Sequence, residues 1–474
     1  MISTTESLGF AAPSPARPAG LRQGTLTPLE SLSQSIANIA PTLTPALNIT
    51  VVAGLAGASS WLAYLVATVA MLVVGANINV LARRHALSGS FFIYIGRTLG
   101  PFAGVMAGWA MIAAYLLTAV AVSVSLGIFL GNVLTETGLG GLTPPAWLLA
   151  PAFLALVGYA AYRDIKLSSR VGLYLEGLSI AIIVFIVAVV TLRHGTLVDG
   201  TQLAPANIHL GSVTSALAFA VFSFVGFESS ATLAKETADP ARNVPRAVML
   251  SAALVGLFFV VASYLMVLAL DGNADIIATS SSPFAEITAH AGLPWAATVV
   301  YGAAMISGFA CALACINAGS RLIFSMGRFR FFGSGVGAVH ARHRTPHRAV
   351  MVGLLATLAV SLALTPMKPI DAFGDSGTVA TFGFLVVYLL VCIVAPLDLK
   401  RHGELKPINV VASVAGVALM LFVIWGSLYP VPDYPLNLLP YVFALYMLAG
   451  AAWFLYLRRT APQELANIEH DLES

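Results

Sequence analysis

The chain has 474 residues, of which 58% are hydrophobic and 9% are charged, with a formal net charge of +3 and a mean hydropathy of +0.88. Ordinary soluble domains carry about 25% charged residues. This composition therefore excludes a soluble enzyme and indicates a polytopic helical membrane protein whose surroundings are the lipid bilayer, with no nucleic-acid partner.

The chain is predicted to begin with a cytoplasmic tail and then to cross the membrane many times. Residues 1–30 are polar and rich in Ala, Pro and Ser, which predicts disorder, and they lack the short apolar core and cleavage site of a signal peptide. A bilayer-spanning helix needs about 20 apolar residues. Twelve such segments follow, near 31–52, 59–80, 101–130, 146–162, 171–192, 211–234, 247–270, 294–320, 347–366, 376–397, 408–428 and 437–457.

The positive charges in the loops support this count. Of the 24 Lys and Arg residues, all but Arg193 and Lys368 fall in alternate loops and in the two tails. Short cytoplasmic loops are enriched in Lys and Arg, and a wrong number of spans would scramble the alternation. The sequence therefore predicts twelve transmembrane helices in the plasma membrane with both termini in the cytoplasm.

The first span carries two prolines, Pro41 and Pro45, in "SQSIANIAPTLTPALNI", residues 33–49. Proline removes a backbone amide donor and clashes with the preceding helical turn, and unpaired backbone at membrane depth is tolerated only where protein or a water-filled cavity satisfies it. We therefore predict a half-helix, an unwound segment at Asn38–Thr42, and a second half-helix. A simple proline kink is the alternative.

The sixth span, "AFAVFSFVGFESS", has a similar irregularity, with Gly226 in mid-membrane beside the carboxyl group of Glu228. Glycine weakens a helix, and a carboxyl group at that depth is costly unless it has a function or a partner; a purely structural Glu228 is the alternative.

Because spans one and six are five apart, a second copy of a five-span unit enters the membrane from the opposite side. Broken helices at matching positions of inverted halves indicate a midplane site in a secondary transporter. Half-helix ends can hold a carboxylate and an ammonium group, which matches an α-amino acid.

Three stretches resemble the amino acid–polyamine–organocation transporters: "FSFVGFESSATLAKETADPARNVPRAV" from Phe222, "SGSFFIYIGRTLGPFAGVMAGW" from Ser88, and "SRLIFSMGR" from Ser320. The resemblance covers spans one to ten. It implies alternating access and a 5+5 inverted-repeat fold with two further C-terminal helices. The resulting division of the chain is 1–30 tail, 31–192 first repeat, 209–397 second repeat, 408–457 spans eleven and twelve, and 458–474 cytoplasmic tail.

The resemblance also implies a substrate site between the unwound parts of spans one and six. Asn38, Ile39 and Ala40 stand where the family has a Gly-x-Gly, so side chains replace bare backbone there. Phe222 falls at the position of an aromatic gate, and Glu228 at that of a glutamate implicated in the proton response of arginine/agmatine antiporters. The implied substrate-binding residues are Asn38, Ile39, Ala40, Pro41, Thr42, Phe222, Ser223, Phe224, Val225, Gly226 and Phe227.

Other candidate sites are weaker. Ser179 stands where some permeases of this family have a lysine. Span eight offers Cys311, Ala312 and Cys315 where sodium-driven relatives have hydroxyl groups, which disfavours sodium as the coupling ion. Protonation of Glu228 is the remaining route for coupling. Cys311 and Cys315 are interpreted as small packing residues, and Glu176 as structural. The loop histidines His340, His343 and His347 lack Cys or Asp partners. We expect no metal and no cofactor.

The sequence thus predicts a proton-linked permease for an amino acid, with a small-molecule substrate and a proton as partners. A polyamine or amine transporter, or an exchanger, on the same fold is the rival, but several ammonium groups would need several carboxylates in the site. This favours a neutral amino acid. A nutrient sensor would need a larger cytoplasmic domain, and an intramembrane enzyme would need a catalytic pair that the spans lack.

Overall fold

The computed structural model describes residues 21–85, 90–163, 165–280, 282–328, 331–333, 335–429 and 431–460. Within these ranges the regular elements are α-helices and short 3₁₀-helices. The described part contains no β-sheet, and its single isolated bridge joins Leu26 to Thr237. The prediction of an all-α protein is confirmed.

The chain up to residue 207 forms the first group of helices. They are α1 (Pro28–Ile39), α2 (Leu43–Ala56), η1 (Gly57–Ser59), α3 (Ser60–Arg84), α4 (Ser90–Leu99), α5 (Pro101–Glu136), η2 (Gly140–Leu142), α6 (Ala146–Arg163), α7 (Ile165–His194), α8 (Gly200–Leu203) and η3 (Pro205–Asn207).

The rest of the chain forms the second group. Its members are α9 (Leu210–Phe222), η4 (Ser229–Glu236), α10 (Pro240–Leu268), α11 (Ala274–Thr279), α12 (Pro283–His290), α13 (Trp295–Arg328), α14 (His347–Ala363), α15 (Pro369–Arg401), α16 (Pro407–Leu428), η5 (Leu436–Leu438) and α17 (Leu439–Thr460).

Each of the twelve predicted apolar segments lies on helix, and two of them are split, into α1 with α2 and into α9 with η4. In the described residues nine helical stretches are long and apolar enough to cross a membrane, with α2 to α3 counted as one of them. Two shorter apolar helices, α9 and α14, add to these. The chain is thus a multi-pass helical membrane protein, and the exact number of spans stays a prediction.

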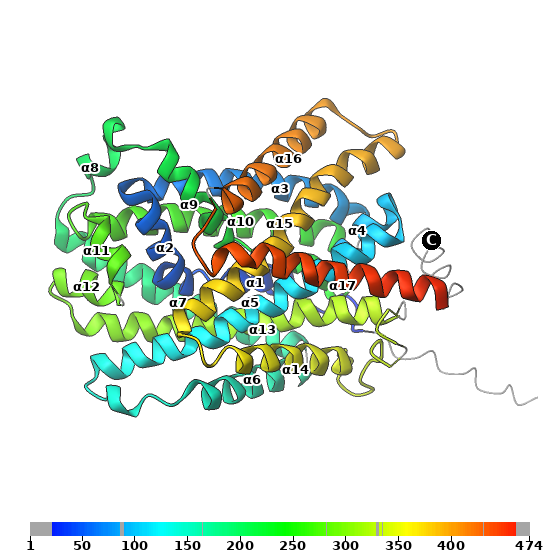
Figure 1. Ribbon diagram of the computed structural model, residues 1–474, viewed down its shortest axis with the longest axis horizontal. Helices are drawn as coiled ribbons and strands as arrows, with labels where there is room; N and C mark the ends of the chain where they lie inside the picture. Colours follow the sequence, from blue (N-terminus) through cyan, green and yellow to red (C-terminus); the bar gives the residue numbers. More distant parts are fainter. Residues whose placement is uncertain are drawn as a thin grey trace, which may run out of the picture.

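The long helices run side by side, with α1 and α5 in the middle and α16 towards the outside (Figure 1). Helix α5 packs against α13 and α15, and α3 packs against α10. Small residues permit this closeness: a Cβ atom at Gly383 of α15 would lie 2.7 Å from the Ala110 carbonyl oxygen of α5. Short helices α8, α11 and α12 lie at one end of the bundle and α4 at the other (Figure 1).

The first helix begins nearer to the N-terminus than the predicted tail of residues 1–30 allows. Helix α1 begins at Pro28 with a capping box, in which Glu30 Oε2 accepts from the Thr27 amide at 2.9 Å and Thr27 Oγ1 accepts from the Glu30 amide at 3.2 Å. This Thr-x-x-Glu pattern is a helix-start signal, so the predicted tail of 1–30 extends too far. Residues 1–20 and 461–474 lie outside the described part.

Candidate functional site

Span one is broken, over a shorter stretch than predicted. Helix α1 continues through Asn38 and Ile39, and Ala40 adopts the left-handed conformation (φ 53°, ψ 62°) before α2 starts at Leu43. The residue before a proline is disfavoured in the right-handed helical region, which explains why the chain turns at Ala40, directly before Pro41. The predicted unwound segment Asn38–Thr42 is therefore corrected to Ala40–Thr42.

The backbone carbonyls around this break have partners. The Ala37 oxygen accepts from the Ala40 amide at 3.1 Å, and the Ala40 oxygen accepts from the Thr44 amide at 3.0 Å. The Ile39 oxygen accepts from Thr44 Oγ1 at 3.3 Å. Pro45 lies in the first turn of α2, where a helix has no use for the missing amide. Pro41 alone therefore accounts for the break.

Span six is broken at the predicted place. Helix α9 ends at Phe222, turns occupy 223–228, and the second half is the 3₁₀-helix η4 with Glu228 at its N-cap. Gly226 has φ +92°, a region in which glycine avoids the strain of a side chain. The Phe227 carbonyl, freed by the turn, accepts from Ser251 Oγ at 2.9 Å.

The two breaks lie against each other. Gly226 faces Asn38 so closely that a Cβ atom at Gly226 would overlap the Asn38 side chain. Two thiols of α13 hold Asn38: Cys311 Sγ donates to its backbone oxygen and Cys315 Sγ to its Oδ1, each at 3.2 Å. These cysteines thus bond the broken span in addition to packing. The Asn38 amide nitrogen Nδ2 is buried and has no hydrogen-bond partner among the described residues.

Glu228 is buried beside the second break and accepts from two tyrosines. Tyr115 of α5 donates to Oε1 at 2.7 Å, and Tyr388 of α15 donates to Oε2 at 2.5 Å. Glu228 therefore connects the second half of span six to two neighbouring spans, an arrangement that a structural glutamate bonded to neighbouring helices would also have.

A second buried carboxyl group, Glu176 of α7, lies beside the first break. Ser307 of α13 donates to its Oε1 at 2.9 Å, whereas Oε2 has no partner among the described residues. Ser179, one turn along α7, accepts from Thr42 Oγ1 at 3.0 Å and so joins α7 to the break.

The remaining predicted site residues are buried, and several side chains point to other neighbours. Phe224 packs its ring against Phe259 of α10 at 5.4 Å between centroids, and Phe227 packs against Tyr388 at 5.6 Å. Ser223 accepts from Asn48 Nδ2 at 3.2 Å and bonds the Tyr64 hydroxyl at 3.0 Å. The side chains of Phe224 and Phe227 thus serve packing, while the backbone of the turn remains beside Asn38.

A cavity of about 370 Å³ lies between α2, α9, α15, α16 and the segment 431–436. Phe222 lines it, together with Asn48, Phe373, Gly374 and Thr381. The segment 223–228 behind Phe222 is buried. Phe222 therefore separates this cavity from the turn of span six.

The opposite end of the bundle is closed by one buried charge pair, by backbone bonds and by a second ion pair whose arginine is exposed. Arg321 of α13 donates to both carboxylate oxygens of Glu236 at 3.0 and 3.1 Å, and both side chains are fully buried. Residues 24–26 bond the backbone of the same segment, at the Lys235 and Glu236 oxygens. Arg170 of α7 donates to Glu30 of α1 at 2.7 Å. A cavity thus reaches from one end of the bundle as far as Phe222, and buried contacts close the other end.

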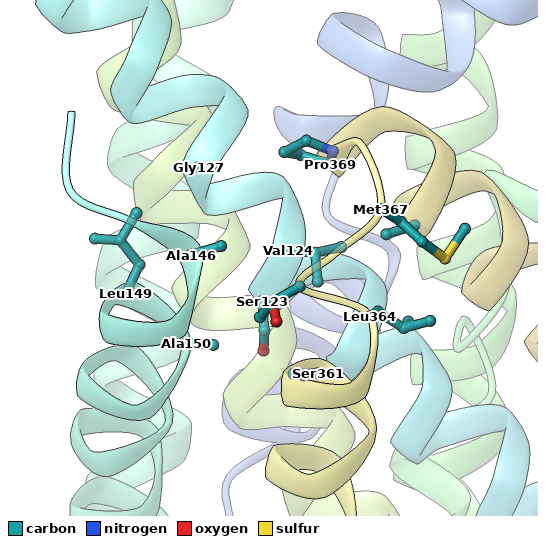
Figure 2. A pocket seen from close by; sticks show the side chains of 12 residues that line it. Ser123, Val124, Gly127, Ala146, Leu149, Ala150, Ser361, Leu364, Met367 and Pro369 are labelled. Carbon is teal, nitrogen blue, oxygen red and sulfur yellow. The ribbon is translucent and has the colours of Figure 1, made fainter. Parts of the chain in front are cut away.

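A smaller cavity between α5, α6 and the α14–α15 connection contains none of the predicted site residues. Ser123, Ser361 and Pro369 line it (Figure 2). Its volume is about 20 Å³, which is room for roughly one water molecule. The Ser361 hydroxyl has no partner among the described residues, so this cavity is suited to a buried water and is too small for a substrate.

Sequence reasoning did not identify the tyrosines that hold Glu228, the Asn48–Ser223–Tyr64 group or the Arg321–Glu236 pair. Tyr115 and Tyr388 are separated from Glu228 by 113 and 160 residues. Their hydroxyl groups in mid-span were the available signal, because a buried tyrosine usually needs a hydrogen-bond partner.

Comparison with known proteins identifies transporters among the relatives of this chain. The chain is 26% identical over 393 residues to the branched-chain amino acid permease BcaP of Bacillus subtilis (strain 168), an alignment that covers 78% of this chain and 81% of the relative. It is 26% identical over 364 residues to the low-affinity putrescine importer PlaP of Escherichia coli (strain K12), covering 75% of this chain and 78% of the relative. The amino acid permease family matches residues 30–455. The chain belongs to the amino acid permease family.

Proposed function

We propose that this protein is a secondary active transporter that moves a neutral amino acid across the plasma membrane by alternating access, coupled to protons through Glu228. The main observation in support of this proposal is that the two broken spans lie against each other. Asn38 contacts Gly226, and the Tyr115–Glu228–Tyr388 group lies beside them. Broken helices that meet in the middle of a bundle supply polar backbone to a substrate in an otherwise apolar interior.

The packing of the helices supports an inverted-repeat arrangement. Under the proposed 5+5 division, each span of the first repeat has a counterpart five spans later. Helix α3 is span two, and its counterpart α10 is span seven. Helix α5 is span three, and its counterpart α13 is span eight. The structure packs α3 against α10 and α5 against α13. Counterpart helices in contact are what a pseudo-twofold axis through the site would produce.

The open cavity and the sealed opposite end support alternating access. The cavity above Phe222 lies on the side of the connections that are poor in Lys and Arg, and the Arg321–Glu236 pair lies towards the basic side. With the basic side in the cytoplasm, this arrangement is an outward-facing state. Transport then requires Phe222 to move aside so that substrate can enter, and afterwards the Arg321–Glu236 side to open.

The unpartnered amide of Asn38 favours an amino acid over a polyamine. A buried donor without an acceptor costs about 1–3 kcal/mol, and a substrate carboxylate would satisfy it. Protonated putrescine, which the relative PlaP imports, has donors only and could not. Both Glu228 oxygens are already bonded to tyrosines, which leaves Glu228 poorly placed to bind a second ammonium group.

Uptake into proteoliposomes tests the proposal. Labelled branched-chain and other neutral amino acids, basic amino acids and putrescine are offered with and without an inward pH gradient. We expect accumulation of neutral amino acids only with the gradient. Accumulation of putrescine instead would establish the rival amine transporter.

The variant N38D sharpens that choice, since it replaces the free donor by an acceptor of the same shape. We expect N38D to weaken amino acid uptake strongly. A variant with normal amino acid uptake, or with enhanced putrescine uptake, would contradict the assigned role of Asn38.

A further inference from the structure

Phe222 closes the floor of the outer cavity against one residue of α15. Its ring reaches Gly377, where a Cβ atom would lie 2.5 Å from Phe222 Cζ and 2.9 Å from Cε1. Real Cβ atoms do not approach this closely, so any other residue at 377 would displace the ring or the helix. Phe373, one turn away on the same face of α15, packs its ring 6.3 Å from that of Phe222.

The neighbouring glycine shows that this contact is particular to position 377. Gly374 also lies on α15 and also lines the cavity, yet a Cβ atom there would have no heavy atom of a neighbouring element of the described chain within 4 Å. Glycine inside a helix is unfavourable relative to alanine. The close approach of Phe222 gives a reason for glycine at 377 that is missing at 374.

We propose that Gly377 is the seat of the Phe222 gate: a positioning residue whose missing side chain lets the ring close over the turn of span six. This inference rests on the proposed transport function for its purpose, though not for its test. Helix α15 also carries Tyr388, which donates to Glu228 on the far side of the turn. One helix thus contacts both the gate and the proposed proton site.

Thiol labelling tests the seat without requiring transport. Ser223 follows Phe222, is buried, and bonds Asn48, which lines the cavity. In an S223C background we expect slow reaction with an impermeant thiol reagent added from the cavity side. G377A should raise that rate several-fold because the ring can no longer close, whereas G374A should leave it unchanged. The native Cys311, Cys315 and Cys392 are buried, and protein without S223C measures their background.

A double variant distinguishes the seat from a general distortion of α15. With F222A there is no ring to position, so labelling should be fast and G377A should add nothing to it. A further rise on adding G377A, or no effect of G377A in the presence of Phe222, would overturn the proposal. If G377A fails to insert, F222L/G377A should recover folded protein, and failure of that recovery counts against the contact.

The same proteins separate this inference from the proposed function. If no substrate is transported but labelling follows the expected pattern, the gate contact stands and the transport proposal fails. If transport occurs and labelling does not respond to G377A, the gate contact fails alone.

Discussion

The two buried carboxyl groups beside the breaks differ in what binds them. Glu228 accepts from two tyrosines on two different helices, at 2.7 and 2.5 Å. Glu176 accepts from Ser307 at 2.9 Å, and its second oxygen has no partner among the described residues. An anion in an apolar interior needs donors to compensate for lost water, and Glu228, with a donor on each oxygen, is better compensated than Glu176.

The difference matters for coupling. A protonated Glu228 would donate from one oxygen, so one tyrosine would have to accept from Glu228 instead of donating to it, and the link from η4 to α5 or α15 would change. Glu176 is joined to α13 by Ser307, and Ser179, which also donates to Glu176 at 3.5 Å, links it to Thr42 of the first break. A change of proton on Glu228 can therefore alter the packing of three elements, whereas one on Glu176 alters little.

The largest effect is expected from E228Q. Glutamine keeps the shape of a protonated glutamic acid and cannot release a proton. We expect substrate binding and exchange to persist while accumulation driven by a pH gradient is abolished. The measurement is uptake into proteoliposomes with and without the gradient, with counterflow as the test of exchange. Normal gradient-driven accumulation by E228Q would move coupling away from Glu228.

The next effect concerns the break beside Glu176. Proline costs about 3 kcal/mol relative to alanine inside a helix, and Pro41 holds Ala40 out of the helical region. P41A should let α1 and α2 join as one helix, with transport lost although the protein still inserts. P45A is the matched control, because Pro45 lies in the first turn of α2, and we expect near-normal transport from it. Equal loss in both variants would contradict the assignment of the break to Pro41.

The sequence was sufficient for the features that are local. Apolar length located the helices, Pro41 and Gly226 located the breaks, and the carboxyl of Glu228 located the proposed proton site. It overestimated the break by including Asn38 and Ile39, because Ala40 can end the helix with a left-handed turn that satisfies the Ala37 carbonyl.

What the sequence could not supply are contacts between distant parts of the chain. Cys311 lies 273 residues from the Asn38 oxygen to which it donates, and apolar periodicity does not indicate which helix face meets which break. The fully buried Arg321 looked like a loop charge because it sits at the end of an apolar segment. Only the fold shows that Glu236 is opposite it.

A smaller effect is expected when one donor to Glu228 is removed. A hydrogen bond to a charged group contributes about 1.5–3 kcal/mol. Y388F should therefore weaken gradient-driven uptake and shift its pH dependence upward, because an anion with one donor fewer binds its proton more tightly. Y115F should shift it in the same direction. Uptake measured as a function of pH checks this; an unchanged profile in both variants would show that the tyrosines do not govern the proton on Glu228.

The smallest effect is expected from E176Q. Glutamine can still accept from Ser307 through its oxygen, and its amide nitrogen replaces an oxygen that already has no partner among the described residues. If Glu176 is held in its neutral form, this exchange of one uncharged group for another should leave accumulation and its pH dependence unchanged and shift the unfolding temperature little. S307A provides the contrast, since it removes the shorter of two bonds to the same oxygen and leaves only Ser179 at 3.5 Å, a loss of about 0.5–1.5 kcal/mol. A loss of gradient-driven accumulation in E176Q as complete as in E228Q would show that the first break also carries a proton, and the contrast between the two carboxyl groups would then be one of partners and not of function.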